Sequence, residues 1–116
     1  MFDFEKLDVY QITKDQNVKV LSYLKGAAGM DEYLLDQWKR ASLSSLLNLA
    51  EGTGRMTDSD KRHFLTIARG SVFEAVAILD LLRSMNVVPE NTYLEFYGNY
   101  EQISKMLLGM YRSYVK

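Results

Sequence analysis

Residues 90–115 read ENTYLEFYGNYEQISKMLLGMYRSYV and carry the clearest periodic pattern in the chain. Large apolar and aromatic residues recur there at spacings of three and four: Tyr93, Phe96, Tyr100, Ile103, Leu107, Met110 and Tyr114. This spacing aligns side chains along one face of an α-helix. Pro89 precedes the stretch and suits a helix start, where its missing N–H has no partner to lose. We therefore predict an amphipathic helix from about Glu90 to Val115.

Three further helices are predicted upstream of this one. Glycines at 26–29 and 52–54, and the segment 86–89, divide the chain into four pieces. The first three pieces predict helices from about Lys6 to Leu24, Asp31 to Glu51, and Asp58 to Met85. No alternating run bounded by turns predicts a strand. Four helices joined by short connections favour an all-α, antiparallel up-down-up-down four-helix bundle, with residues 1–116 as a single domain.

Two local features qualify this prediction. The first helix has the weakest apolar face, because the polar Gln16 and Asn17 dilute its middle. Gly52 or Gly54 is expected to end the second helix with a left-handed cap. The sequence Gly52-Thr-Gly54-Arg55 is not a phosphate-binding loop, because no Gly-Lys-Ser/Thr follows it.

Composition excludes several classes of site. The 116 residues contain no Cys, which rules out disulfide scaffolds, zinc fingers, iron–sulfur sites and cysteine nucleophiles. A di-metal site in a four-helix bundle uses two Glu-x-x-His motifs, and His63 is the single histidine. We therefore expect neither a metal nor a cofactor.

The net charge is −1, from 14 basic and 15 acidic residues. This balance excludes a strongly basic nucleic-acid binder, although a local basic patch is compatible with it. The N-terminal residues lack the pattern of a signal peptide, and the apolar stretch Val72–Leu82 is too short to span a bilayer. We expect a cytoplasmic protein without a membrane anchor.

The two middle helices carry more apolar surface than a monomer needs. Each predicted helix, 31–51 and 58–85, has a second apolar stripe, whereas a bundle requires about one apolar face per helix. A surplus face is most simply hidden against another subunit. We therefore predict self-association through Leu43 and Leu47. The alternative is that helix 58–85 is the most enclosed helix of a monomer.

Basic residues are expected to gather at one end of the bundle. In the up-down order, this end holds the connection between the second and third helices and the end of the fourth. The candidate nucleic-acid contacts are Arg55, Lys61, Arg62, Lys105 and Arg112, with Lys116 beside them. Tyr111 and Tyr114 are candidate surface contacts, whereas the other aromatics are assigned to the core. The alternative is a solvated end whose cations favour helix C-termini.

A buried polar network is the second candidate site. Glu74 falls within an apolar stripe, and a buried carboxylate needs partners. We predict a structural network of Asn48, Glu51, Arg69 and Glu74 that fixes helix register or seals a subunit interface. The alternative, a catalytic carboxylate pair, has no nucleophile or metal partner in the sequence.

Several stretches resemble one bacterial family in order and spacing. They are FEKLDVY at 4–10, Asp36-Gln37, Arg40-Ala-Ser42, NLAEG at 48–52, Gly54-Arg55, and FLTIARGS at 64–71 followed by Glu74. The family is the bacterial four-helix bundle proteins, also called 23S rRNA intervening-sequence proteins or the S23 ribosomal protein family. The resemblance implies an antiparallel four-helix bundle, usually assembled as a ring-shaped homopentamer without enzymatic activity. A related branch includes accessory proteins of diversity-generating retroelements, which engage a reverse transcriptase and nucleic acid.

The pattern and the resemblance together predict a non-enzymatic, homopentameric scaffold that contacts RNA or DNA through its basic end. Weak patches repeated around a ring would gain avidity without a high net charge. The alternative is a protein–protein adaptor, for a reverse transcriptase or another nucleic-acid enzyme, with no direct contact to nucleic acid.

Overall fold

Four long helices make up most of the computed structural model, which describes residues 1–27 and 29–116. A 3-10 turn, η1 (Asp3–Lys6), precedes the helices α1 (Asp8–Lys25), α2 (Glu32–Thr53), α3 (Asp58–Ser84) and α4 (Glu90–Ser113). No strand occurs in the described part of the chain. The predicted all-α fold with four helices is therefore confirmed.

Short polar side chains begin two of these helices. The Asp31 carboxylate accepts a hydrogen bond from the Leu34 N–H at 3.1 Å, at the start of α2. The Thr57 hydroxyl accepts one from the Asp60 N–H at 3.1 Å, at the start of α3. Each cap satisfies a backbone donor that the first turn of a helix leaves unpaired.

The predicted left-handed cap at the end of α2 is wrong. Gly54 caps α2 with a φ of −86°, which any residue adopts. Gly52 is instead constrained by space, because a Cβ there would lie 3.1 Å from the Cβ of Phe64. Positive φ values occur at Gly29 (87°) and at Asn86 (60°), which follows α3. Asparagine tolerates this conformation better than most residues.

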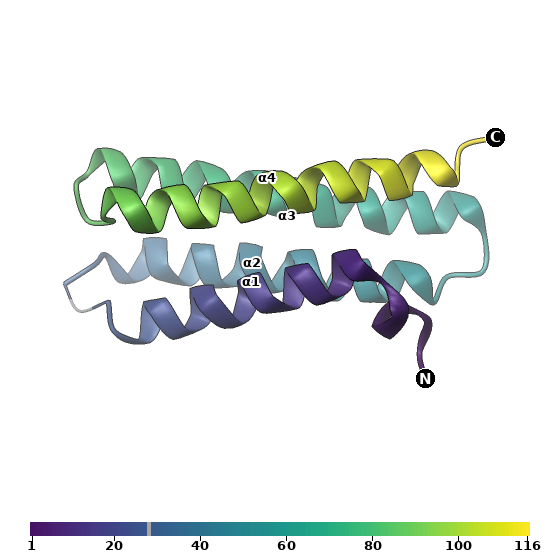
Figure 1. Cartoon of the computed structure of the whole chain (residues 1–116), viewed down its shortest axis with the longest axis horizontal. Coiled ribbons are helices and arrows are strands. Elements are labelled where there is room, and N and C mark those ends of the chain that lie inside the picture. Colours follow the sequence, from purple (N-terminus) through teal and green to yellow (C-terminus); the bar gives the residue numbers. More distant parts are fainter. Residues whose placement is uncertain (28) are drawn as a thin grey trace.

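The helices run alongside one another along the long axis of the molecule (Figure 1). The connections α1–α2 and α3–α4 lie at one end, and the α2–α3 connection lies at the other end with both termini. The most extensive contact is between α2 and α3, and the next is between α3 and α4. All four helices form one compact bundle.

Apolar side chains from every helix fill the centre. The fully buried core includes Val20 of α1, Trp38 and Leu49 of α2, Leu79 of α3 and Leu107 of α4. This burial removes apolar surface from water and is the main stabilising term of such a bundle.

Buried polar side chains form hydrogen bonds between helices where α1, α2 and α4 meet. The Trp38 Nε1–H donates to the Tyr100 hydroxyl at 2.9 Å, and Gln16 Nε2 donates to the Phe96 carbonyl at 3.0 Å. The side-chain amide of Asn99 donates to Gln16 Oε1 at 2.9 Å. Gln16 and Asn17, which the sequence pattern treats as interruptions, are therefore buried core residues.

None of the helices, within the residues described, is both long and apolar enough to cross a membrane.

Tyr100→Phe should lower the free energy of unfolding by about 1–3 kcal/mol, because it leaves the buried Trp38 N–H without an acceptor. Chemical denaturation followed by circular dichroism measures this change. Tyr97→Phe is the matched control on the same helix, because Tyr97 is 38% exposed. Equal stability of the two variants would contradict the assigned hydrogen bond.

Candidate functional site

Cations gather where the α2–α3 connection meets the end of α4. The Arg62 guanidinium donates to the Tyr114 carbonyl, and the Lys61 ammonium lies 5.5 Å from the centre of the Tyr114 ring. Lys116 approaches Asp58 at 3.8 Å. Contacts of basic side chains therefore hold the C-terminal residues against the start of α3.

Part of this positive charge is already neutralised within the chain. Arg55 Nη2 pairs with Glu51 Oε1 at 2.7 Å, and its guanidinium lies 4.3 Å from the centre of the Phe64 ring. Arg112, in the last turn of α4, is exposed. Arg112 is consequently better placed for an external anion than Arg55, whose charge has a local partner.

The end of the bundle is also hollowed. A shallow cleft of about 770 Å³ lies between the start of α3 and the C-terminal residues, and Arg62, Tyr111 and Lys116 line it with Asp58. Tyr111, which lines the cleft, and Tyr114, near it in the sequence, are both half-buried and retain some exposed surface. The cleft presents cations and aromatic surface beside one carboxylate.

Lys105 lies away from this end. It belongs to the middle of the α3–α4 face, where its ammonium approaches the Glu101 carboxylate at 3.9 Å. The structure thus gathers Arg55, Lys61, Arg62 and Arg112 at one end and separates Lys105 from them.

The predicted buried polar network does not form within the chain. Glu51 and Glu74 are exposed, and Glu51 pairs with Arg55. Asn48 Nδ2 donates to the Ser44 carbonyl at 2.9 Å, and Arg69 Nε donates to the Ser104 carbonyl at 3.2 Å. The prediction fails because both carboxylates lie on the outer faces of their helices, where solvent replaces a buried partner.

A different polar pair links α2 to α3. The Ser44 and Ser71 hydroxyls are 2.8 Å apart, and the Ser71 hydroxyl also donates to the Ile67 carbonyl at 3.0 Å. Two small side chains at this contact let the helices approach closely. The sequence pattern places Ser71 on an apolar stripe but does not identify its partner.

Leu43 and Leu47 project from the outer face of α2. Their exposed fractions are 44% and 55%, respectively. On α3 the large apolar residues with exposed surface are Ile67, Phe73 and Leu81. The surplus apolar surface predicted for the two middle helices is thus exposed in the single chain.

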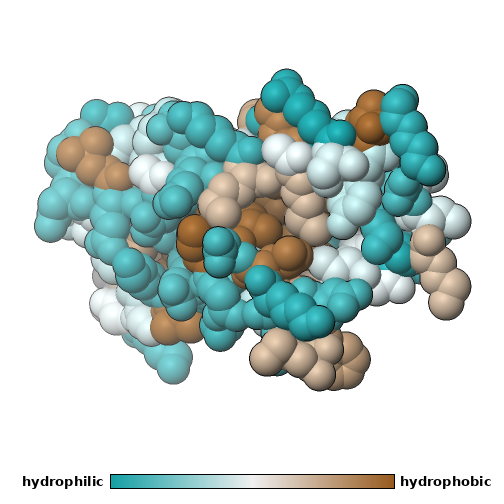
Figure 2. Space-filling view, turned by 45° about the vertical axis from the view of Figure 1, so that its right-hand side comes forward, coloured by the Kyte–Doolittle hydropathy of each residue, from teal (hydrophilic) through white to brown (hydrophobic). Residues whose placement is uncertain are grey.

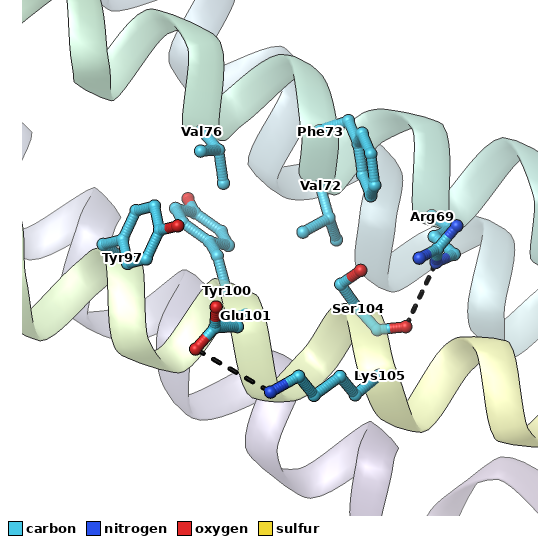
Figure 3. Close-up of a pocket in the computed structure, with 9 residues that line it drawn as sticks. All are labelled: Arg69, Val72, Phe73, Val76, Tyr97, Tyr100, Glu101, Ser104 and Lys105. Carbon is cyan, nitrogen blue, oxygen red and sulfur yellow. Dashed lines mark hydrogen bonds and ion pairs between the residues drawn. The ribbon is translucent and has the colours of Figure 1, made fainter.

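A groove runs between α3 and α4. It contains two cavities of about 340 Å³ each, and both cavities are lined by Arg69 and Phe73. Figure 3 shows the first cavity, with Arg69, Phe73 and Val76 on α3 facing Tyr97 and Glu101 on α4. The Arg69 guanidinium lies 4.8 Å from the centre of the Phe73 ring, so these two side chains separate the cavities.

The groove is a hollow with an apolar floor. Val72 and the ring of Tyr100 form part of the first cavity. Burial raises the pKa of the Tyr100 hydroxyl, which therefore stays protonated and uncharged near neutral pH. Phe73 and Tyr97 fall outside the apolar stripes of their predicted helices. Aromatic residues at such positions are the one feature of the sequence that could have indicated the groove.

The face formed by α1 and α4 has a different character. Figure 2 views it obliquely, toward the end with both termini, and hydrophilic side chains cover most of it. An apolar hollow lies near the centre of the view. This face is mainly a solvated surface.

The acidic and histidine side chains are dispersed over the bundle. Over residues 1–27 and 29–116, no group of three or more His, Cys, Asp or Glu could hold a metal ion. His63 is exposed, and its ring lies 5.4 Å from that of Phe64.

Four helices in one bundle, with apolar residues on outer faces, define a small all-α bundle protein. Residues 5–109 match the 23S rRNA-intervening sequence protein family, and the chain belongs to this family. No protein of curated function matches the chain.

A solved structure shares the fold. It is a protein of unknown function from the S23 ribosomal protein family of Bacteroides thetaiotaomicron. The TM-score is 0.85 at 19% identity, over 89% of this chain and 97% of that one.

Gly52→Ala should lower the free energy of unfolding by about 1 kcal/mol, because the new methyl group would crowd the Cβ of Phe64 at 3.1 Å. Gly70→Ala is the matched control, since no atom lies within 4 Å of a Cβ there. It should raise stability by up to about 1 kcal/mol through helix propensity. Denaturant titration measures both, and equal stabilisation would contradict the close α2–α3 approach.

Proposed function

We propose that this chain is a non-enzymatic cytoplasmic scaffold that self-associates into a ring-shaped homopentamer and contacts RNA or DNA through one end of the bundle. The observation that carries the proposal is the exposure of Leu43 and Leu47, one turn apart on α2. Contiguous apolar surface on a soluble chain favours burial against a partner.

The proposed subunit is an up-down-up-down antiparallel bundle. Contacts between distant segments support this order: Arg62, at the start of α3, bonds the Tyr114 carbonyl just after α4. Gln16, in the middle of α1, bonds the Phe96 carbonyl in α4. Such an order leaves the α2–α3 connection and the end of α4 together, so each subunit would present its cations at the same end.

Assembly would raise the affinity of a weak basic patch for nucleic acid by repeating the patch in every subunit. Each subunit contributes Lys61, Arg62 and Arg112 in addition to the partly neutralised Arg55. Five copies on one face of a ring would bind phosphates multivalently, and affinity rises with the number of phosphates neutralised. The name of the family, which refers to 23S rRNA, supports RNA as the first ligand to test.

A protein–protein adaptor without nucleic-acid contact is the second candidate. The ion pairs Arg55–Glu51 and Lys116–Asp58 favour it, because they reduce the positive charge at the end of the bundle. A reverse transcriptase or another nucleic-acid enzyme would be the partner of such an adaptor.

Leu47→Asp should convert an oligomer into a monomer of 13.4 kDa with unchanged helix content, because it places a charge on exposed surface rather than in the core. Light scattering and circular dichroism measure the two properties. Val18→Asp, at a 59% exposed site on α1, is the matched control and should leave assembly unchanged. A wild-type chain that is monomeric at micromolar concentration would contradict self-association.

Replacing Arg55, Lys61, Arg62 and Arg112 together with Gln should weaken RNA binding and flatten its salt dependence. The slope of log affinity against log salt should fall by about 0.7 for each phosphate of a single strand that the variant no longer neutralises. Fluorescence anisotropy with a labelled single-stranded RNA measures this. Because Arg62 also fastens the chain terminus, Arg112→Glu alone tests the same surface with less risk to folding.

The matched control replaces Lys14, Lys19, Lys25 and Lys39 with Gln, which removes four charges outside the cationic end. If both fourfold variants lose the same affinity, binding is non-specific. If the wild-type chain shows no binding at low salt, the adaptor function replaces the nucleic-acid function.

A further inference from the structure

The chain carries a protruding apolar feature and a hollow one on different faces. Leu43 and Leu47 project from α2, and the two cavities between α3 and α4 are each large enough to admit a leucine side chain. Two different complementary patches on one subunit permit a heterologous contact, in which each copy binds the next head to tail.

The protrusion and the hollow lie at the same level along the bundle. The Ser44–Ser71 hydrogen bond of 2.8 Å places the turn with Leu43 and Leu47 beside the turn of α3 that holds Arg69 and Phe73. The bond from Arg69 to the Ser104 carbonyl then brings α4 to that level. A rotation about an axis parallel to the helices keeps the height of every residue, so the leucines of one copy would lie level with the groove of the next.

The spacing of the two features also agrees. Leu43 and Leu47 are separated by about 6 Å along α2, at about 1.5 Å per residue. The cavities follow one another along α3, since one extends from Arg69 to Val76 and the other from Leu65 to Phe73. Two leucines spaced by one turn would therefore each meet a separate cavity, with Arg69 and Phe73 between them.

Charges flanking the two features are complementary. Arg40 lies one turn before Ser44 on α2, and Glu101 lies one turn before Ser104 on α4. With both helices in the same register, Arg40 of one copy would face Glu101 of the next. Asp36 and Lys105, which pair with these two side chains within the chain at 2.7 Å and 3.9 Å, would lie beside the contact.

We propose that Leu43 and Leu47 of one copy occupy the α3–α4 groove of the next copy, with Arg40 against Glu101. This inference rests on the proposed self-association and specifies its interface. The occupant of the groove is a second copy of this chain. Because the contact is heterologous, each added copy offers a free groove or free leucines until the ring closes.

Two variants block opposite sides of this contact. Gly70→Trp fills the groove, and it should spare the fold because a Cβ at this exposed position meets no atom within 4 Å. The double variant Leu43→Asp, Leu47→Asp removes the protrusion and leaves the groove intact. Each variant alone should be a monomer, whereas Gly70→Ala should assemble like the wild type.

Mixing the two variants gives the decisive result. The Gly70→Trp copy still has its leucines, and the double variant still has its groove, so one contact forms and cannot propagate. Light scattering should report a heterodimer of twice 13.4 kDa. A mixture that stays monomeric overturns the inference, as does a Gly70→Trp variant that assembles like the wild type. A monomeric wild type would overturn the proposed self-association itself.

A charge exchange provides an independent test that leaves the groove open. Glu101→Arg should weaken assembly at least tenfold, and adding Arg40→Glu to the same chain should recover it. Glu95→Arg, on another face of α4 where Glu95 pairs with Lys19 at 3.3 Å, is the matched control. Absence of recovery in a folded Arg40→Glu, Glu101→Arg chain would overturn the proposed register.

Discussion

The close approach of α2 and α3 is the constraint on which the rest of the structure depends. Ser44 and Ser71 meet directly, and Gly52 leaves room for Phe64 where the two helices converge. Small side chains at both contacts allow extensive packing between the helices. Because the outer faces of α2 and α3 stay open, the residues that complete their apolar stripes are exposed rather than buried. A partner that covers these exposed apolar faces is therefore the first place to look for the function of the chain.

The same packing separates two properties that could be confused. Stability comes from a core that includes buried polar residues, with Gln16, Trp38 and Tyr100 hydrogen-bonded between helices. We propose that recognition uses surface features: the α2 leucines, the α3–α4 groove and the cationic end. A change at the α2 leucines or at the cationic end can alter assembly or binding while the fold persists, because neither surface supplies the central core.

The helices could be predicted from the sequence because their apolar spacing, proline and capping residues are local signals. Surface exposure of Leu43 and Leu47 followed from the surplus of apolar stripes. The burial of Gln16 could not be predicted, because its acceptor, the Phe96 carbonyl, is 80 residues away. The predicted network failed since Glu51 finds Arg55 one turn along its own helix. The groove depends on how α3 and α4 pack, which periodicity alone does not specify.

The central claim is that the α2 leucines of one copy lie in the α3–α4 groove of the next. The chain has no Cys, so introduced thiols report contacts without interference. The most direct measurement mixes Leu47→Cys with Gly70→Cys under mild oxidation and resolves the products on a non-reducing gel. The claim predicts a disulfide-linked dimer in the mixture and little dimer from either variant alone. Efficient cross-linking of Leu47→Cys with itself, and none in the mixed pair, would contradict it.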